Sequence, residues 1–178
     1  MYQHLKIKTE EKWAIIPEFP TYEVSSYGNV RNVKTDRIMR TSRTEFGHVK
    51  ITLTSDYYGW RKTRGVAQLV AEAFIEKPSM LCDQVMILDG DFDNVASDNL
   101  VWRPRWYAWK YTHQIKMAQP LHYRNLPVIN IVNECRYSSI IVAGMTEGLL
   151  FDEIWRSTYT GAKLFPFGAI FDVVEFRV

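Results

Sequence analysis

Between residues 66 and 100 the sequence predicts a helix, a short strand and a polar turn in that order, which limits the folds open to the chain. The apolar residues of 66–74 recur at i, i+3, i+4, i+7 and i+8, as on one face of an α-helix, and Pro78 marks its end. The segment 84–88 reads as a strand and 90–94 as a polar turn. This mixture of elements predicts an α+β fold.

Residues 1–64 are expected to form an antiparallel β-rich motif. Glycine and proline residues separate short runs of strand-forming residues in this part of the chain. In the run 49–54 apolar and polar residues alternate, which places one set of side chains on a core. The other set, Lys50, Thr52 and Thr54, is expected to point outward.

The rest of the chain is expected to divide into three further modules, with boundaries after residues 102 and 126. Residues 65–102 form a core, and 103–126 form a basic, aromatic connector that is either a helix or an extended segment. Residues 127–178 form a small module that begins with a strand over 127–132 and ends with a strand over 165–174. Within it, 138–145 and 152–158 read as two helices joined by a short turn, which is typical of a helix-turn-helix.

Charge is distributed in blocks along the chain, although the formal net charge is only +2. Residues 28–64 contain nine Lys or Arg and three acidic residues, and residues 100–125 contain five Lys or Arg and no acidic residue. Residues 76–99 contain six acidic residues and one Lys. The two basic blocks predict surfaces that face a polyanion such as DNA. The alternative is that these side chains only solvate strands and a helix.

Membrane and disulfide-stabilised classes are not indicated. No apolar run approaches the length of a membrane span, and the N-terminus lacks the apolar stretch of a signal peptide. The chain is therefore expected to stay in the cytoplasm. Cys82 and Cys135 are expected to be free thiols, because they lie far apart and neither has a CxxC partner.

Three segments together resemble the phage-type HNH homing endonucleases. Residues 11–32 match the family pattern W-x-x-I-P-G-F-x-x-Y-x-V-S-x-x-G-x-V-R, which belongs to a β-rich DNA-binding motif. Residues 66–74, with Asp89-Gly90, Asn94 and 99–102, are similar to the HNH core of the ββα-metal type. Residues 127–174 are similar to the helix-turn-helix module that often follows it. The resemblance implies these modules in this order.

The same resemblance implies that the catalytic centre is degenerate. It places a metal-binding Asn or Asp at position 86 and the general-base His at 87, where this chain has Met86 and Ile87. Neither side chain binds a hard cation or accepts a proton from water. Asp89, Asn94 and Asn99 retain the surrounding frame. We therefore expect no catalytic residue, metal or cofactor, and a chain that is not an enzyme.

Nearby acidic residues leave one alternative open. Asp83, Asp89, Asp91, Asp93 and Asp98 could form a different metal site, which would support nicking of DNA by a rearranged centre. They are interpreted instead as turn, capping or solvated residues, because they lack the ligand spacing of a calcium-binding loop.

The residues expected to contact DNA are basic and polar side chains that could neutralise phosphates or reach base edges. They are Arg31, Asn32, Lys34, Arg37, Arg40, Arg43, Lys50, Arg61, Lys62 and Arg64 in the β-rich motif, Arg103, Arg105 and Lys110 in the connector, and Arg156, Ser157, Thr158 and Tyr159 in the last module. For Arg31 a structural role in the turn is the alternative. Most of the connector's aromatic residues are expected to pack inward.

The sequence thus predicts a sequence-specific, double-stranded-DNA-binding protein of phage or mobile-element type, derived from a homing endonuclease and catalytically inactive. Occupation of a site would make it a transcriptional repressor or a site-occluding factor, at the nucleoid or in a phage-infected cell. Two alternatives stay open: an active nicking endonuclease with a rearranged metal site, and a protein-interaction module. The sequence does not distinguish a monomer from a dimer.

Overall fold

The computed structural model describes residues 10–55, 57, 59–116, 125–166 and 168–174, and the chain divides into two compact units. The first unit comprises residues 1–79 and 92–102, and the second comprises 80–91 and 103–178. Strand β9 (Leu100–Arg103) lies where the chain passes from the first unit to the second. The segment 80–102 is therefore shared between the two units.

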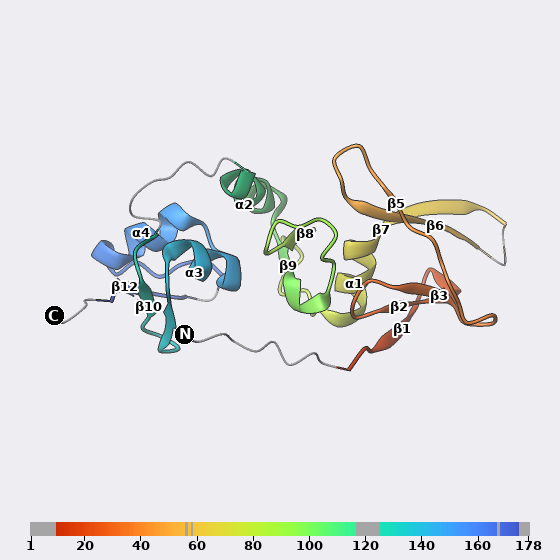
Figure 1. The fold of residues 1–178 in the computed structure, drawn as a ribbon, viewed down its shortest axis with the longest axis horizontal. Coiled ribbons are helices and arrows are strands. Elements are labelled where there is room, and N and C mark those ends of the chain that lie inside the picture. Colours follow the sequence, from red (N-terminus) through yellow and green to blue (C-terminus); the bar gives the residue numbers. More distant parts are fainter. Residues whose placement is uncertain (1–9, 56, 58, 117–124, 167, 175–178) are drawn as a thin grey trace. The chain divides into compact units, whose positions relative to one another are not determined.

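Two antiparallel sheets form most of the first unit (Figure 1). The first sheet has the order β1 (Trp13–Ile16), β2 (Phe19–Ser25), β3 (Val30–Asn32) and β4 (Arg37–Ile38). The second has the order β5 (Ser42–Arg43), β6 (Val49–Thr54) and β7 (Arg61–Gly65). Strands that follow one another in sequence pair with one another, as the closely spaced turn residues predict.

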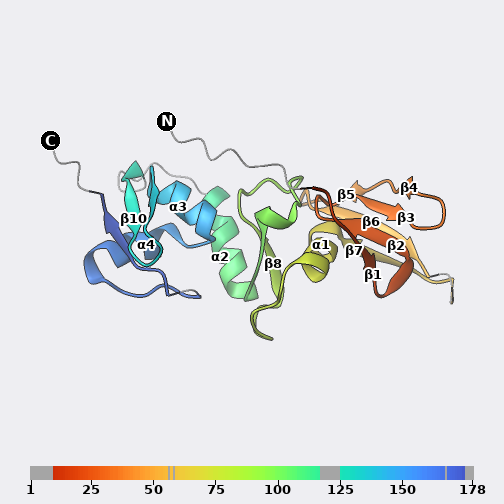
Figure 2. The ribbon, with the colours of Figure 1, turned by 90° about the horizontal axis from the view of Figure 1, so that it is seen from below.

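Helix α1 (Val66–Phe74) begins directly after β7 and contacts strands of both sheets (Figure 2). Its buried residues are Val66, Leu69, Val70 and Ala71. The helix and the first part of its apolar face are thus as predicted, whereas Ala73 at the end of that face is exposed. Ile51 and Leu53 of β6 are buried, in agreement with the alternation in this strand. A short 3-10 turn, η1 (Ser97–Asn99), also contacts α1.

The second unit combines a three-stranded antiparallel sheet with three helices. Its elements are β8 (Gln84–Ile87), α2 (Arg105–Lys116), β10 (Val128–Asn130), β11 (Cys135–Tyr137), α3 (Ile140–Glu147), α4 (Phe151–Thr160) and β12 (Phe171–Val173). The sheet has the order β11-β10-β12, and α4 packs against β12 and α3. Apolar residues of these elements, including Val128, Ile140 and Ile154, form one buried core.

The two helices α3 and α4 are joined by a tight connection. The hydroxyl of Ser139 accepts a hydrogen bond from the backbone N–H of Val142 and so caps the start of α3. Gly148 ends α3 with a φ of 65°, a left-handed conformation that favours glycine. A Cβ at this position would lie only 2.9 Å from Cδ2 of Leu88. Gly148 therefore permits both the turn and the close approach of the strand segment 84–88.

The predicted α+β class is confirmed, and several element boundaries differ from the expectation. The two C-terminal helices begin and end within about two residues of their predicted limits, but the final strand, expected over 165–174, is only three residues long. The connector contains a helix, and its residues 117–124 lie outside the described part of the chain. Among the described residues, no helix is both long and apolar enough to cross a bilayer.

Candidate nucleic-acid interface

The β5–β7 sheet has one face that carries no acidic side chain. Residues directly opposite each other on antiparallel strands point to the same side. The pairings Ser42–Lys50–Gly65, Thr52–Thr63 and Thr54–Arg61 therefore define one face, which we call the outer face. Ser42, Thr52, Arg61 and Thr63 are exposed, and Lys50 and Thr54 are half-buried. This face offers two cations and four hydroxyl groups to solvent.

The dimensions of the outer face suit a DNA groove. The six residues of β6 span about 20 Å at about 3.3 Å per residue. A two-stranded β-ribbon fits in the major groove of B-DNA, which is about 12 Å wide. Hydroxyl groups can donate to and accept from base edges, and lysine and arginine can neutralise phosphates. Thr52 and Thr63 were not among the residues expected to contact DNA, although strand alternation already placed Thr52 outward.

The opposite face of the same sheet has a different role. Ile51 and Leu53 are buried there, and they are paired with Arg64 and Lys62 on β7. Both cations bind the carboxylate of Glu18 in the turn between β1 and β2. The hydrogen bond from Lys62 lowers the pKa of the Glu18 carboxyl, and Arg64 acts in the same direction. Lys62 and Arg64 thus connect two sheets.

Arg64 is more extensively paired than Lys62. Its side chain is only 15% exposed, and Nη2 also lies 2.8 Å from both carboxylate oxygens of Glu72 on α1. The guanidinium therefore links β7 to the β1–β2 turn and to the helix. An arginine held in this way is a poor candidate for a phosphate contact, since it would first have to leave two carboxylates.

Arg31 and Asn32, two further expected DNA contacts, stabilise the turn between β3 and β4. The Arg31 guanidinium binds Glu23 at 2.8 Å and Asp36 at 3.0 Å, and it lies 4.2 Å from the centroid of the Trp13 ring. The side-chain oxygen of Asn32 accepts hydrogen bonds from the backbone N–H groups of Lys34 and Thr35. These contacts favour the structural role for Arg31. Lys34, Arg37 and Arg40 in and beyond this turn are exposed.

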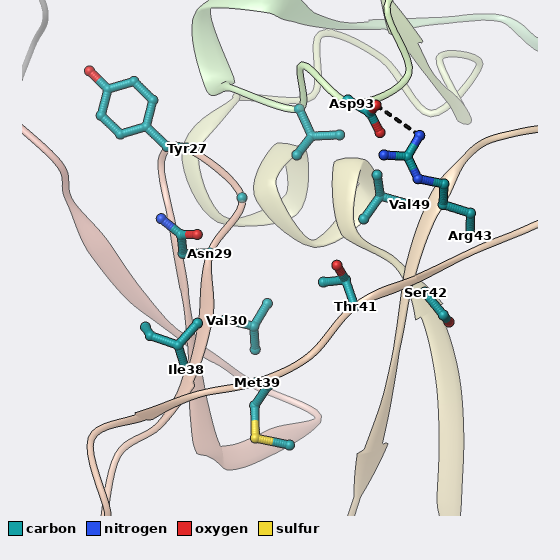
Figure 3. Close-up of a pocket in the computed structure, with 12 residues that line it drawn as sticks. Tyr27, Asn29, Val30, Ile38, Met39, Thr41, Ser42, Arg43, Val49 and Asp93 are labelled. Atoms are coloured by element: carbon teal, nitrogen blue, oxygen red, sulfur yellow. Dashed lines mark ion pairs between the residues drawn. The ribbon is translucent and has the colours of Figure 1, made fainter.

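A cavity of about 390 Å³ lies beside the two sheets of the first unit (Figure 3). Arg43 and Asp93 line it and form an ion pair of 2.8 Å, and Tyr27, Asn29 and Thr41 are among the other lining residues. The Arg43 side chain is 63% exposed. Next to this ion pair, the rings of His48 and Phe92 lie 4.1 Å apart. The loop at 92–93 is therefore held against the β5–β6 hairpin.

The basic residues of the second unit are not equally accessible. Arg103 is 1% exposed; its guanidinium lies over the Tyr107 ring, and burial lowers its pKa. Ser157 is fully buried, donates to the backbone oxygen of Ala162 and accepts from the backbone N–H of Phe171. The sequence predicts both at a DNA surface, but side chains packed in the interior cannot reach a duplex. Arg105, Lys110, Arg156 and Tyr159 are exposed, and Thr158 is half-buried.

The positions that the HNH resemblance assigns to chemistry are apolar and buried. Met86 is 2% exposed and Ile87 is 8% exposed. Met86 Cε lies 3.3 Å from the position that a Cβ of residue 148 would occupy, so its side chain packs inside the second unit. Neither residue supplies an oxygen or nitrogen ligand. Among the described residues, no group of three or more His, Cys, Asp or Glu is arranged to hold a metal ion. The residues present therefore do not fit the metal centre of that family.

The retained polar residues around this segment stabilise turns. The carboxylate of Asp89 accepts a hydrogen bond of 2.9 Å from the backbone N–H of Asp91, and Gly90 follows with a φ of 75°. The side-chain amide of Asn99, which is buried, donates to the backbone oxygen of Asn94 at 2.8 Å. Asp89 and Asn99 thus each form a hydrogen bond with a nearby backbone group.

Comparisons with known proteins agree with the resemblance seen in the sequence. Residues 11–58 match the NUMOD4 motif. The chain is 35% identical over 91 residues to an uncharacterized HNH endonuclease, L245, of Acanthamoeba polyphaga mimivirus; the match covers 51% of this chain and 26% of the relative. The chain therefore spans about a quarter of that relative's length.

A solved structure described as "DNA binding and cleavage by the HNH homing endonuclease I-HmuI" has a similar fold. It matches with a TM-score of 0.51 and 24% sequence identity, over 93% of this chain and 99% of the other. The likeness at this identity is one of fold.

These comparisons correct one expectation. The replacement of two catalytic side chains predicts a chain that is not an enzyme, but both relatives are named as HNH endonucleases. Met86 and Ile87 show only that strand β8 supplies no metal ligand or general base at these two positions. They do not define the activity of the whole protein. The comparisons therefore contradict the expectation that the chain is not an enzyme. The chain carries a NUMOD4 motif, and its sequence and fold resemble those of the HNH homing endonucleases.

Proposed function

We propose that this chain binds a specific sequence in double-stranded DNA, and that the outer face of the β5–β7 sheet is its main contact. The observation that carries the proposal is the composition of that face, where Lys50 and Arg61 flank exposed threonines and no acidic side chain is present. Cations next to hydroxyl groups on a twisted ribbon suit both phosphates and base edges. The description of the solved structure with a similar fold, which names DNA binding by an HNH homing endonuclease, supports binding to DNA.

Accessible basic and polar side chains of each unit extend the contact. Lys34, Arg37 and Arg40 are exposed in the same unit. In the second unit Arg105, Lys110, Arg156 and Tyr159 are exposed, and Thr158 is half-buried. We retain these as contacts and leave out Arg103 and Ser157, which are buried. Arg31, Asn32, Lys62 and Arg64 act mainly by keeping the β-rich part of the chain in shape, since each is engaged with neighbouring groups.

The experiment begins with selection of bound duplexes from a random library and measurement of Kd across a range of salt concentrations. Wild-type protein is expected to enrich one sequence and to bind it less tightly as salt rises. Lys50→Ala and Arg61→Ala should each weaken binding and reduce the salt slope by about 1. Arg136→Ala, which removes an exposed cation from β11, is the matched control. Failure to enrich any sequence, or equal effects of all three substitutions, would contradict the proposal.

Site occupation has a consequence for transcription. A protein that stays on one duplex site blocks a polymerase or a competing nuclease, so we propose repression or site occlusion as one use of the binding. A reporter with the selected site placed over its promoter tests this. Expression should fall with the wild-type chain and recover with Lys50→Ala, in whichever compartment holds the DNA. Equal expression with and without the site would exclude repression.

Nicking of DNA is a second candidate function. The names of both relatives favour it, and the turns around Asp89 and Asn99 are retained. The side chains of Met86 and Ile87 offer no ligand for a hard cation, which does not favour nicking. Among the described residues, no cluster of side chains supports a reaction step through a metal. Supercoiled plasmid incubated with Mg²⁺ or Mn²⁺ gives the test. Open-circular product that Asp89→Ala abolishes, in a variant that still binds DNA, would support nicking.

A further inference from the structure

Helix α2 presents two tryptophans to solvent on one stripe. Trp106 is 57% exposed and Trp109 is 67% exposed. Together with Lys110 and His113, which are also exposed, they occupy positions i, i+3, i+4 and i+7 of the helix. We call these four residues the aromatic stripe. The sequence predicts that most aromatic residues of this segment pack inward, which is true of Tyr107 and Tyr111 but not of these two tryptophans.

The buried side of α2 fixes which residues face outward. Tyr107, Ala108 and Tyr111 are buried in the second unit. The Tyr111 hydroxyl donates to the backbone oxygen of Leu88 at 2.7 Å and also lies 3.3 Å from that of Gly144. The helix cannot rotate without breaking these contacts, so Trp106 and Trp109 are kept in solvent by the packing of the opposite face.

Neighbouring side chains hold the two indole rings against the helix surface. The Trp109 and His113 rings are stacked, with centroids 5.2 Å apart and an angle of 9° between their planes. The Lys110 ammonium lies 5.3 Å from the centroid of the Trp106 ring. Flat aromatic faces therefore alternate with a cation along about two turns of helix.

The charges of α2 decide what kind of molecule would cover such a stripe. The helix contains no acidic residue, and Arg105 at its start is 79% exposed. Glu153 on α4 acts electrostatically on Lys110, so one acid does approach the stripe. A partner with flat aromatic groups and negative charge matches rings interleaved with cations. The bases and phosphates of a DNA strand have both properties.

The length of the stripe limits the number of bases. Residues 106 and 113 are about 10 Å apart along the helix at 1.5 Å per residue. Bases stacked along a strand are about 3.4 Å apart, so the stripe spans two or three of them. In an intact duplex the faces of the bases are covered by their neighbours, and only unpaired or unstacked bases can offer a face to tryptophan.

We propose that the aromatic stripe stacks on unpaired bases within duplex DNA, so that the chain prefers a duplex containing a short unpaired step over a fully paired one. The proposal rests on the DNA binding proposed above and adds a second contact with a different chemistry. The outer face would hold the paired duplex, while Trp106 and Trp109 would hold exposed bases.

Fluorescence anisotropy with three labelled DNAs tests the proposal: a duplex, the same duplex with a short central bubble, and the single strand. The wild-type chain should bind the bubbled duplex roughly tenfold or more tightly than the paired one, with quenching of tryptophan emission. The double substitution of Trp106→Ala and Trp109→Ala should remove this preference and change the Kd of the paired duplex by about twofold or less. Phe46→Ala, which removes an exposed ring between β5 and β6, is the matched control.

The possible results separate this inference from the proposed function. Weaker binding of both duplexes upon Lys50→Ala, together with a bubble preference of the wild-type chain that the double alanine variant loses, supports both. Absence of binding to any DNA overturns the proposed function as well. Binding of the paired duplex without a bubble preference, or a preference that the double alanine variant keeps, overturns the aromatic stripe alone.

Two further measurements test whether the double alanine variant is folded and whether the aromatic stripe binds a membrane surface instead. Should the alanine variant show a changed circular dichroism spectrum, Trp106→Phe with Trp109→Phe replaces it; this variant keeps ring faces and is expected to retain a weaker preference. Binding of the wild-type chain to anionic lipid vesicles, abolished by the alanine substitutions while bubble binding is unchanged, would assign the stripe to a membrane surface and contradict the proposal.

Discussion

Thr52 and Thr63 face each other across strands β6 and β7, with their hydroxyl oxygens 2.8 Å apart. Both side chains are exposed on the outer face, between Lys50 at one end and Arg61 at the other. A hydroxyl group both donates and accepts hydrogen bonds, so two paired hydroxyls still have acceptor lone pairs for other partners. The pair is therefore a preformed polar centre on the outer face.

Replacement of both threonines by valine tests whether this centre reads sequence. Valine has nearly the shape of threonine and a strong strand preference, so the fold should be kept. We expect the Kd for the selected site to rise about tenfold or more, because a base-edge contact contributes roughly 1–3 kcal/mol to discrimination. Binding to random duplex should change by about twofold or less. Parallel titrations of both DNAs measure the difference, and an equal loss on the two DNAs would show that the hydroxyls do not discriminate.

Arg64 is expected to affect stability more than DNA contact. Its guanidinium bridges Glu18 and Glu72, so Arg64→Ala leaves Glu18 with Lys62 alone and Glu72 without this cation. The free energy of unfolding should fall by about 1 kcal/mol, the upper end for partly exposed ion pairs. Urea denaturation at low and high salt measures this, and the loss should shrink as salt screens the pairs. Lys12→Ala, which removes an exposed cation from the same unit, is the control. If Arg64→Ala left stability unchanged but weakened DNA binding, Arg64 would instead be assigned as a DNA contact.

These ion pairs show why part of the interface could not be predicted from the sequence. Alternation along β6 and the helical period of α1 are local patterns. They correctly predict that Ile51 and Leu53 of β6, and Val66 and Leu69 of α1, are buried. The partner of Arg64, however, is Glu18, 46 residues earlier in the chain. A cation count along the sequence cannot distinguish a paired arginine from an accessible one, because the pairing depends on the register of two sheets.

The second unit illustrates the same limit on helices. The sequence predicts two helices close to the positions of α3 and α4, since their apolar residues and Gly148 are local signals. The rotation of each helix depends on the core it packs against. The rotation of α4 buries Ser157, and the rotation of α2 exposes Trp109. Both are the reverse of what is usual for polar and aromatic residues.

Ser157 therefore provides a second stability prediction. Its hydroxyl connects the backbone oxygen of Ala162 to the backbone N–H of Phe171, and it joins the end of α4 to β12. Ser157→Ala would leave the buried backbone N–H of Phe171 without this acceptor, at a cost of about 1–3 kcal/mol in the free energy of unfolding. Arg156→Ala, one residue earlier and exposed, should leave stability nearly unchanged. Thermal denaturation compares the two, and equal Tm values would contradict the bridging role.

Glu153 gives a stability prediction that depends on pH. Burial raises the pKa of its carboxyl above the ordinary value of 4.5, although Lys110 and Arg156 oppose the shift and Asp152 adds to it. Between 4.5 and the raised pKa the folded chain holds a proton that the unfolded chain has lost, so stability falls as pH rises through this window. Above the window the buried charge continues to destabilise the fold. Glu153→Gln should therefore exceed the wild type in free energy of unfolding at pH 7 and equal it below pH 4.5. Asp152→Asn removes the same charge from an exposed neighbour, and urea titrations from pH 4 to 8 compare all three. Parallel pH curves for the wild type and Glu153→Gln would show that burial of this carboxyl does not control the stability of the second unit.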